Sequence, residues 1–179
     1  PVRDVEKAKE FMAAAGLETL DLRLDLQDTT EYGTWAEIIQ QNLAEIGINL
    51  ELNPMESSAY WSTSFGEQAA INNELLTSNY SMNPDPAWAT MWFTCDQVGV
   101  WNTESWCNER YDELHQLGLV TTDPVERQAI YEEMQQIWEA DYKTVWITHG
   151  ILTYAYLPSV VPATTPNGIS QYEYFKPAE

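Results

Sequence analysis

The sequence of 179 residues is poor in basic residues, and this shortage excludes one class of partner. It has 8 lysine and arginine residues against 28 aspartate and glutamate residues, which gives a formal net charge of −20. Such a chain repels phosphate groups, so we expect it to bind neither nucleic acid nor an anionic membrane surface. The acidic residues are spread along the whole chain, which favours a general role in solubility over a site for cationic ligands.

Metal ligands and long apolar runs are also scarce. No segment approaches the roughly 18–20 apolar residues of a transmembrane helix. Two histidines, His115 and His149, and two cysteines give no zinc-ligand spacing such as Cys-x-x-Cys, so we expect no metal and no cofactor. We expect His115 to contact solvent on a polar helix face. His149 follows a predicted buried strand, which favours a place in the core over metal binding.

The two cysteines, Cys95 and Cys107, form either a local disulfide or two free thiols. We favour the disulfide because the residues between them, DQVGVWNTESW, form a compact polar and aromatic insert that closure would stabilise. The chain-entropy model gives about 3 kcal/mol for a loop of this size. A disulfide implies an oxidising compartment. We expect the tryptophans of this region to pack around the cysteine loop rather than contact a ligand; they are Trp92, Trp101 and Trp106.

The first 80 residues alternate between strand and helix patterns. Four leucines at every second position of LDLRLDL predict a half-buried strand, and Asp4 and Gly16 bound a helix in front of it. The predicted elements are helix 4–15, strand 20–26, helix 34–46, strand 48–52, helix 57–70 and strand 73–80. This βαβαβ order predicts an α/β fold with a parallel sheet and helices on its faces.

The second half of the sequence is more helical. Asp123-Pro124 is a strong start for a helix over 123–141, with Asp123 as the cap and Pro124 at the first helical position. Its predicted buried side comprises Ala129, Ile130, Met134, Ile137 and Trp138. The other predicted elements are helix 108–117, strands 145–148 and 152–157, and a loop-rich tail over 158–179.

Several motifs, taken in order, resemble those of a known family. They are DVEKAKEFMAAAGLE, WAEIIQQNLAEIGINLEL, NPDPAW followed by TCD, WCNERYDEL, DPVERQAIYEEMQQIWEAD and TVWITHG. Together they resemble the carboxy-terminal lobe of the family 5 extracellular solute-binding proteins, the peptide, dipeptide and nickel receptors of bacterial ABC importers. The resemblance extends from about Asp4 to Gly150.

This resemblance implies an architecture and a function. The fold would be a periplasmic-binding-protein-like (type II) lobe with a mixed, mostly parallel sheet and flanking helices. Residues 1–179 would form a single carboxy-terminal lobe, with residues 158–179 returning towards a missing amino-terminal lobe. The protein would be a periplasmic or cell-surface monomer that captures a peptide-like or other small solute by lobe closure. It would deliver that solute to a membrane permease and would not be an enzyme.

The ligand site is expected beyond the carboxyl ends of the strands, where α/β lobes bind their ligands. The resemblance implies that Asp85, in the loop NPDPAW, pairs with an amino group of the ligand through a charge-assisted hydrogen bond. Trp88 would stack against the ligand or wall it off, and Asn83 lies in the same loop. Tyr32, after the first strand, could also reach a ligand.

An alternative interpretation of Asp85 is structural, because Asp85-Pro86 is also a typical cap and first residue of a short helix. The two roles are compatible. Dipeptide receptors often carry a second acidic residue about three positions before the Asp-Pro pair, where this sequence has Ser81 and Met82. This departure weakens the case for a ligand with a free amine. The two histidines give little support to nickel binding.

Two other functions compete with this interpretation. A glycoside hydrolase needs two carboxylates held about 5–10 Å apart, and no pair stands out, since acids such as Glu132 and Glu133 lie on helix faces. The sequence has no GxSxG, no HExxH and no phosphate-binding glycine loop. A carbohydrate-binding module is usually all-β, which the capped helices 34–46 and 123–141 oppose.

Overall fold

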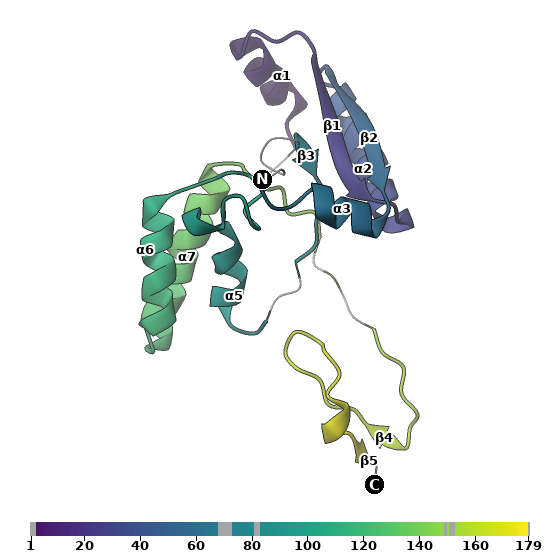
Figure 1. Ribbon diagram of the computed structural model, residues 1–179, viewed down its shortest axis with the longest axis vertical. Coiled ribbons are helices and arrows are strands. Elements are labelled where there is room, and N and C mark those ends of the chain that lie inside the picture. Colours follow the sequence, from purple (N-terminus) through teal and green to yellow (C-terminus); the bar gives the residue numbers. More distant parts are fainter. Residues whose placement is uncertain (1–2, 68–72, 81–82, 149, 151–152, 179) are drawn as a thin grey trace. The chain divides into compact units, whose positions relative to one another are not determined.

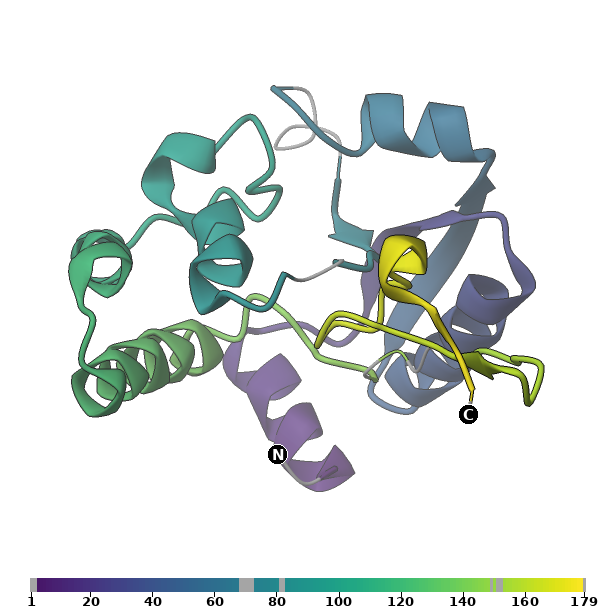
Figure 2. The ribbon, with the colours of Figure 1, turned by 90° about the horizontal axis from the view of Figure 1, so that it is seen from below.

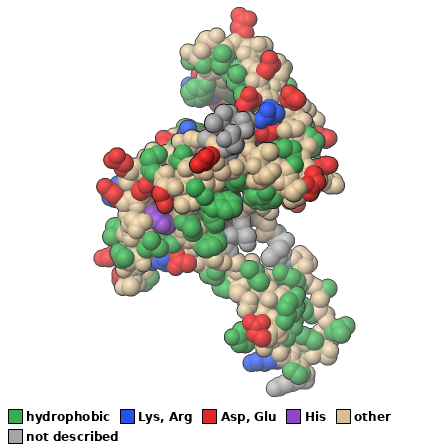
Figure 3. Space-filling view, in the orientation of Figure 1, with side chains coloured by type: hydrophobic (Ala, Val, Ile, Leu, Met, Phe, Trp, Pro, Cys, Tyr) green, Lys and Arg blue, Asp and Glu red, His purple; other side chains and the backbone are tan. Residues whose placement is uncertain are grey.

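A computed structural model describes residues 3–67, 73–80, 83–148, 150 and 153–178 (Figure 1, Figure 2). The chain divides into two compact units. Unit 1 comprises Pro1–Asn79 and Gln97–Ser105, and unit 2 comprises Tyr80–Asp96 and Trp106–Glu179. Acidic side chains are scattered over the face shown in Figure 3 rather than gathered in one cluster, as the sequence predicted.

The alternating leucines form the central strand of a three-stranded parallel sheet in unit 1. The strands are β1 (Leu20–Gln27), β2 (Ile48–Met55) and β3 (Leu75–Leu76), in the order β2-β1-β3. The register of β1 and β2 runs from Leu20 opposite Ile48 to Gln27 opposite Met55. The parallel sheet is therefore confirmed, although β2 continues past its predicted end at residue 52 and β3 covers only two residues of the predicted strand 73–80.

Three helices accompany this sheet: α1 (Val5–Ala14), α2 (Thr30–Ala44) and α3 (Ser57–Thr63). Asp4 caps α1 as predicted. Helix α2 begins four residues earlier than predicted because the Thr29 hydroxyl accepts a hydrogen bond from the Tyr32 N–H at 3.3 Å. Gly47 follows α2 with a φ of +84°, and a Cβ there would lie 2.6 Å from the Glu18 carbonyl oxygen, so only glycine fits.

Helix α2 covers one face of the sheet (Figure 1, Figure 2), and the core of unit 1 lies between them. It contains Leu24, Leu26, Tyr32, Ala36 and Leu50, with Trp35 partly buried against them. The opposite side of β1 is polar. Its Asp25 is buried, and the carboxylate accepts hydrogen bonds from Arg23 Nε at 2.9 Å and Asn53 Nδ2 at 2.7 Å. A buried charge is tolerated at this position because it is paired and hydrogen-bonded.

Unit 2 is built around α6 (Glu109–Val120) and α7 (Pro124–Ala140), which pack against each other, and the short helix α5 (Pro86–Thr90) packs on α6. Asp123 caps α7 by accepting hydrogen bonds from the N–H groups of Val125 and Glu126, as predicted. The core residues are Phe93, Trp106, Tyr111, Leu114, Ile130, Met134 and Trp138. Ala129, which was predicted to be buried on α7, is exposed.

The two strands predicted after α7 are wrong for the residues that the structure describes. Residues 145–148 and 153–157 have no strand pairing, and residue 152 lies outside the described residues. Val145 and Leu157 are 83% and 72% exposed. The apolar pattern alone could not produce a strand, because a strand also needs a neighbour to hydrogen-bond with.

The tail is mostly loop, as predicted. Its only regular elements among the described residues are β4 (Val160–Val161), which pairs antiparallel with β5 (Lys176–Pro177), and a 3₁₀ turn over Tyr172–Tyr174. In the part of the chain that the structure describes, no helix is long and apolar enough to cross a membrane.

Candidate functional site

The carboxyl ends of the three strands in unit 1 are tied together. The Asp28 N–H donates to the Met55 carbonyl at 2.8 Å, which links the ends of β1 and β2. The Thr77 N–H donates to the Asp25 carbonyl at 3.0 Å, which links β3 to β1. Open α/β sheets bind their ligands at this edge, and the expectation that this chain does so stays a prediction.

Tyr32 lies at this edge, in the first turn of α2, with its ring packed into the core. Only 7% of the residue is exposed, and its ring meets Trp35 edge-on with centroids 5.3 Å apart. Burial raises the pKa of the Tyr32 hydroxyl, with a smaller contribution from Glu31. With so little of the side chain exposed, Tyr32 offers a ligand only a small contact area.

Helix α3 follows β2 at the same edge and carries a buried tyrosine. Tyr60 is fully buried, and its hydroxyl donates a hydrogen bond to the Thr77 carbonyl. Burial raises the pKa of this hydroxyl, so it stays protonated and remains a donor. The bond fixes α3 against the segment that follows β3.

Asp85 lies in unit 2 and is the cap of α5, so the structural interpretation of Asp85-Pro86 is confirmed. Its carboxylate accepts the Ala87 N–H at 2.8 Å and an Arg127 nitrogen at 2.8 and 3.0 Å. The bond from Ala87, followed by that from Arg127, lowers the pKa of Asp85. The side chain remains 58% exposed, so part of the carboxylate still faces solvent.

Arg127 is a partner of Asp85 that the sequence did not predict. Its Nε donates to the Gly118 carbonyl at 2.9 Å, and its guanidinium lies over the Tyr131 ring, 5.1 Å from the centroid. The spacing of Arg127 and Tyr131, one helical turn apart, was a visible signal for that contact. The contact with Asp85 was not, because the two residues are 42 positions apart.

The two other predicted ligand contacts of this loop, Asn83 and Trp88, are accessible. Asn83 is exposed, and Trp88 is 38% exposed and meets Trp92 edge-on with centroids 5.4 Å apart. Unit 2 thus brings Asn83, Asp85 and Trp88 together on one short segment, whereas Tyr32 belongs to unit 1. Ser81 and Met82 lie outside the described residues.

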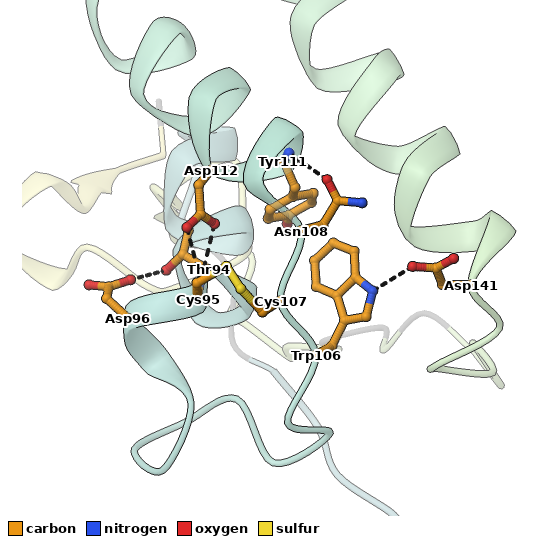
Figure 4. Close-up of a disulfide and its surroundings, with 9 residues drawn as sticks. All are labelled: Thr94, Cys95, Asp96, Trp106, Cys107, Asn108, Tyr111, Asp112 and Asp141. Atoms are coloured by element: carbon orange, nitrogen blue, oxygen red, sulfur yellow. Dashed lines mark hydrogen bonds between the residues drawn. A yellow bond between two sulfur atoms is a disulfide. The ribbon is translucent and has the colours of Figure 1, made fainter.

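The predicted disulfide between Cys95 and Cys107 is confirmed (Figure 4). The Cys95 N–H donates to both oxygens of the Asp112 carboxylate at 3.1 and 3.2 Å, which anchors the bridge to α6. The Trp106 indole N–H donates to the Asp141 carboxylate at 2.6 Å, just past the end of α7. The bridge therefore sits in a framework of hydrogen bonds to both long helices.

The three tryptophans near the bridge have different surroundings. Trp106 is buried in the core of unit 2, and Trp92 packs against that core. Trp101, inside the disulfide loop, belongs to unit 1 and packs against Phe65 with ring centroids 5.7 Å apart.

The prediction that His115 contacts solvent is wrong. His115 is 7% exposed because α5 packs on α6, and its Nδ1 lies 2.9 Å from the Thr90 hydroxyl. Burial lowers the pKa of the imidazole. His149 lies outside the described residues. Within the residues that the structure describes, no group of three or more His, Cys, Asp or Glu side chains is placed to hold a metal ion.

Comparison with known proteins gives consistent matches. Residues 1–99 match the sequence model of the bacterial extracellular solute-binding proteins, family 5 Middle. A probable peptide ABC transporter periplasmic-binding protein of Sinorhizobium fredii is 27% identical over 175 residues, covering 93% of this chain and 32% of that protein. Di/tripeptide-binding protein 2 of Pseudomonas aeruginosa is 26% identical over 162 residues, covering 83% of this chain and 29% of that protein.

A solved structure gives the same fold. The crystal structure of a dipeptide-binding protein from Pseudoalteromonas sp. SM9913, in complex with Met-Leu, is similar with a TM-score of 0.78 at 21% identity, covering 99% of this chain and 36% of that one. The predicted α/β fold of the type II periplasmic-binding-protein class is confirmed. The chain spans about a third of the length of the curated relatives it matches.

Proposed function

Because this chain belongs to the family 5 bacterial extracellular solute-binding proteins, we propose that it is part of the substrate-binding component of an ABC importer. That component would act outside the cytoplasm, in the periplasm or at the cell surface, and deliver its ligand to a membrane permease. The match of residues 1–99 to the family is the observation that carries this proposal. Members of the family are solute-binding proteins, and we propose that this chain, too, binds its ligand without changing it.

The proposed ligand is a short peptide or a similar small solute. The two curated relatives, at 26–27% identity, are named as peptide-binding and di/tripeptide-binding proteins. Residues 1–179 would act as the carboxy-terminal lobe, and the ligand would be held between it and an amino-terminal lobe of the same monomeric protein. Contacts from both lobes would favour the closed form, which is a population shift.

The proposed ligand contacts in unit 2 come from Asn83, Asp85 and Trp88. A carboxylate offers about four acceptor sites, and Ala87 and Arg127 use only part of those of Asp85, so an ammonium group could still bind on its exposed side. It would share the carboxylate with the guanidinium of Arg127, which should weaken recognition of a free amine. The exposed face of Trp88 would wall the ligand. Tyr32, in unit 1, stays a separate predicted ligand contact.

Isothermal titration of the natural full-length protein with dipeptides and tripeptides tests this function. We expect binding of at least one of these peptides and a more compact protein in small-angle X-ray scattering when it is bound. Absence of binding across a panel of free and N-acetylated peptides would refute the peptide proposal.

The role of Asp85 has its own test within the same experiment. Asp85→Asn keeps a side chain that can cap α5 but removes the charge, so it should reduce the preference for a free over an acetylated amino terminus. Trp146→Ala, at a 52% exposed tryptophan outside the proposed site, serves as the control. An unchanged preference in Asp85→Asn would remove Asp85 from the ligand contacts.

A further inference from the structure

Three aromatic rings of unit 1 form a group that the proposed function leaves unused. The Trp61 and Phe65 rings stack at an angle of 24° with centroids 4.8 Å apart, and the Phe65 and Trp101 centroids are 5.7 Å apart. Phe65 is buried, whereas Trp61 and Trp101 are 39% and 40% exposed. We call these three residues the aromatic platform: a buried ring flanked by two partly exposed indoles.

Tyr60 packs beneath two rings of the platform, Trp61 and Phe65. The ring of the fully buried Tyr60 meets Trp61 edge-on at 5.4 Å and Phe65 at 6.0 Å. Its hydroxyl donates to the Thr77 carbonyl, so α3, which carries Trp61, cannot shift without breaking a buried hydrogen bond.

The loop that carries Trp101 is also held by hydrogen bonds. The N–H groups of Val100, Trp101 and Asn102 all donate to the Gln97 carbonyl at 2.9–3.1 Å. The Gly66 N–H donates to the Val100 carbonyl at 3.0 Å and so joins this loop to the segment after α3 that carries Phe65. A surface that is already ordered loses little conformational freedom when a ligand binds.

The platform lies where a ligand is expected. Helix α3 starts directly after the carboxyl end of β2, and Figure 1 shows it beside the carboxyl ends of β1 and β2. The Ser57 hydroxyl on α3 is 3.4 Å from the Gln27 side-chain oxygen at the end of β1. Ligands of open α/β sheets bind outside this edge.

The chemistry of the surroundings favours an apolar group over a sugar. The loop that carries Trp101 also exposes Val98 and Val100, which are 39% and 49% exposed. Val98 and Val100 cannot bond the hydroxyl groups of a sugar, whereas they can pack beside an apolar ring. An aromatic side chain needs only flat apolar partners, with which its ring stacks or meets edge-on.

We propose that the aromatic platform is a binding surface for an aromatic side chain of a peptide ligand. This inference rests on the proposed function and specifies the substrate class. Trp61 and Trp101 contact the ligand ring, and Phe65 holds the two indoles apart. For Trp101 this role replaces the expectation from the sequence that it packs around the cysteine loop rather than contacting a ligand. The platform sets selectivity among peptides and leaves the affinity for small ones unchanged.

Matched tripeptides measure this selectivity. The natural full-length protein is titrated with Ala-Ala-Ala and with Ala-Phe-Ala, and the measured quantity is the ratio of the two dissociation constants. We expect Ala-Phe-Ala to bind at least tenfold more tightly. In Trp61→Ala and in Trp101→Ala the ratio should fall towards one while the affinity for Ala-Ala-Ala stays the same. Trp61→Phe, which keeps a ring on α3, should retain most of the ratio.

Controls separate this role from a structural one. Trp146→Ala should leave the ratio unchanged, and circular dichroism shows whether each variant is folded. The two platform tryptophans lie on different segments, so failure of one variant to fold leaves the other as the test. If the ratio of the two dissociation constants stays at its parent value in a folded Ala variant of Trp61 or Trp101, the inference is overturned. Tighter binding of a mannose oligosaccharide than of Ala-Phe-Ala by the parent protein also overturns it. A parent protein that binds both tripeptides equally also overturns it but leaves the proposed function standing, whereas a parent that binds neither rejects both.

Discussion

Replacing Cys95 and Cys107 together by serine should lower the free energy of unfolding by about 3 kcal/mol. The two residues are 12 positions apart, so the bridge closes a short loop. In the chain-entropy model, closing a loop of about 13 residues removes about 10 cal/mol/K of entropy from the unfolded chain, which is about 3 kcal/mol at 25 °C. The loss of stability should therefore come from the unfolded state.

The folded state should change little in this variant, because other contacts hold the same segment. The bond from the Cys95 N–H to Asp112 uses the backbone, and the bond from the Trp106 indole to Asp141 does not involve sulfur. We therefore expect the tryptophan emission spectrum in the absence of denaturant to match that of the parent protein.

Urea unfolding, followed by tryptophan fluorescence, measures the effect. With a denaturant dependence of about 2 kcal/mol/M, the midpoint should fall by about 1.5 M. Adding a reductant should lower the midpoint of the parent protein to that of the double variant and leave the variant unaffected. A double variant whose midpoint stays within about 0.3 M of the oxidised parent would refute the loop-closure reasoning.

Two further predictions concern titrating groups in unit 2. In an Arg127→Met variant the pKa of Asp85, followed by carboxyl NMR, should rise, because one of its two hydrogen-bond donors is lost. It should stay below its usual 3.8, because the Ala87 N–H remains. An unchanged pKa would show that Arg127 and Asp85 do not pair. In the parent this interaction stabilises the fold above pH 3.8 and is lost as the pH falls through the lowered pKa. His115 has a pKa lowered from 6.5 by burial, which outweighs the opposing effects of Asp112 and Asp96. The unfolded state takes up its proton first, so acidification from pH 7 to pH 5.5 should lower the urea midpoint more in the parent than in His115→Gln; equal losses would contradict this.

The elements that the sequence predicted well are those whose causes are local. The leucines of β1 and the Asp123-Pro124 start of α7 act within one strand and one helical turn. The early start of α2 at Thr30 was not predicted, although Thr29 is a typical cap, because the apolar spacing of this helix begins only at Trp35.

The errors concern causes that lie far away in the sequence. His115 is buried because α5 covers its face of α6, and the periodicity of α6 carries no information about that contact. Arg127 contacts Asp85 although the two residues are 42 positions apart, and no local pattern around either residue indicates this contact. The segment 145–148 has the composition of a strand, but its pairing depends on a neighbour that composition does not reveal.

Strand β1 has one apolar face and one polar face, and this difference restricts where residues can be inserted or deleted. Leu24 and Leu26 face the core under α2, while Asp21 bonds Asn49 and Asp25 bonds Asn53 across to β2 on the other side. Deleting or inserting a single residue within β1 would exchange the two sides and bring Asp25 and its neighbouring charges against α2. Changes of length are therefore compatible with this fold only in the connections, such as residues 16–19 between α1 and β1, where no side-chain alternation has to be kept.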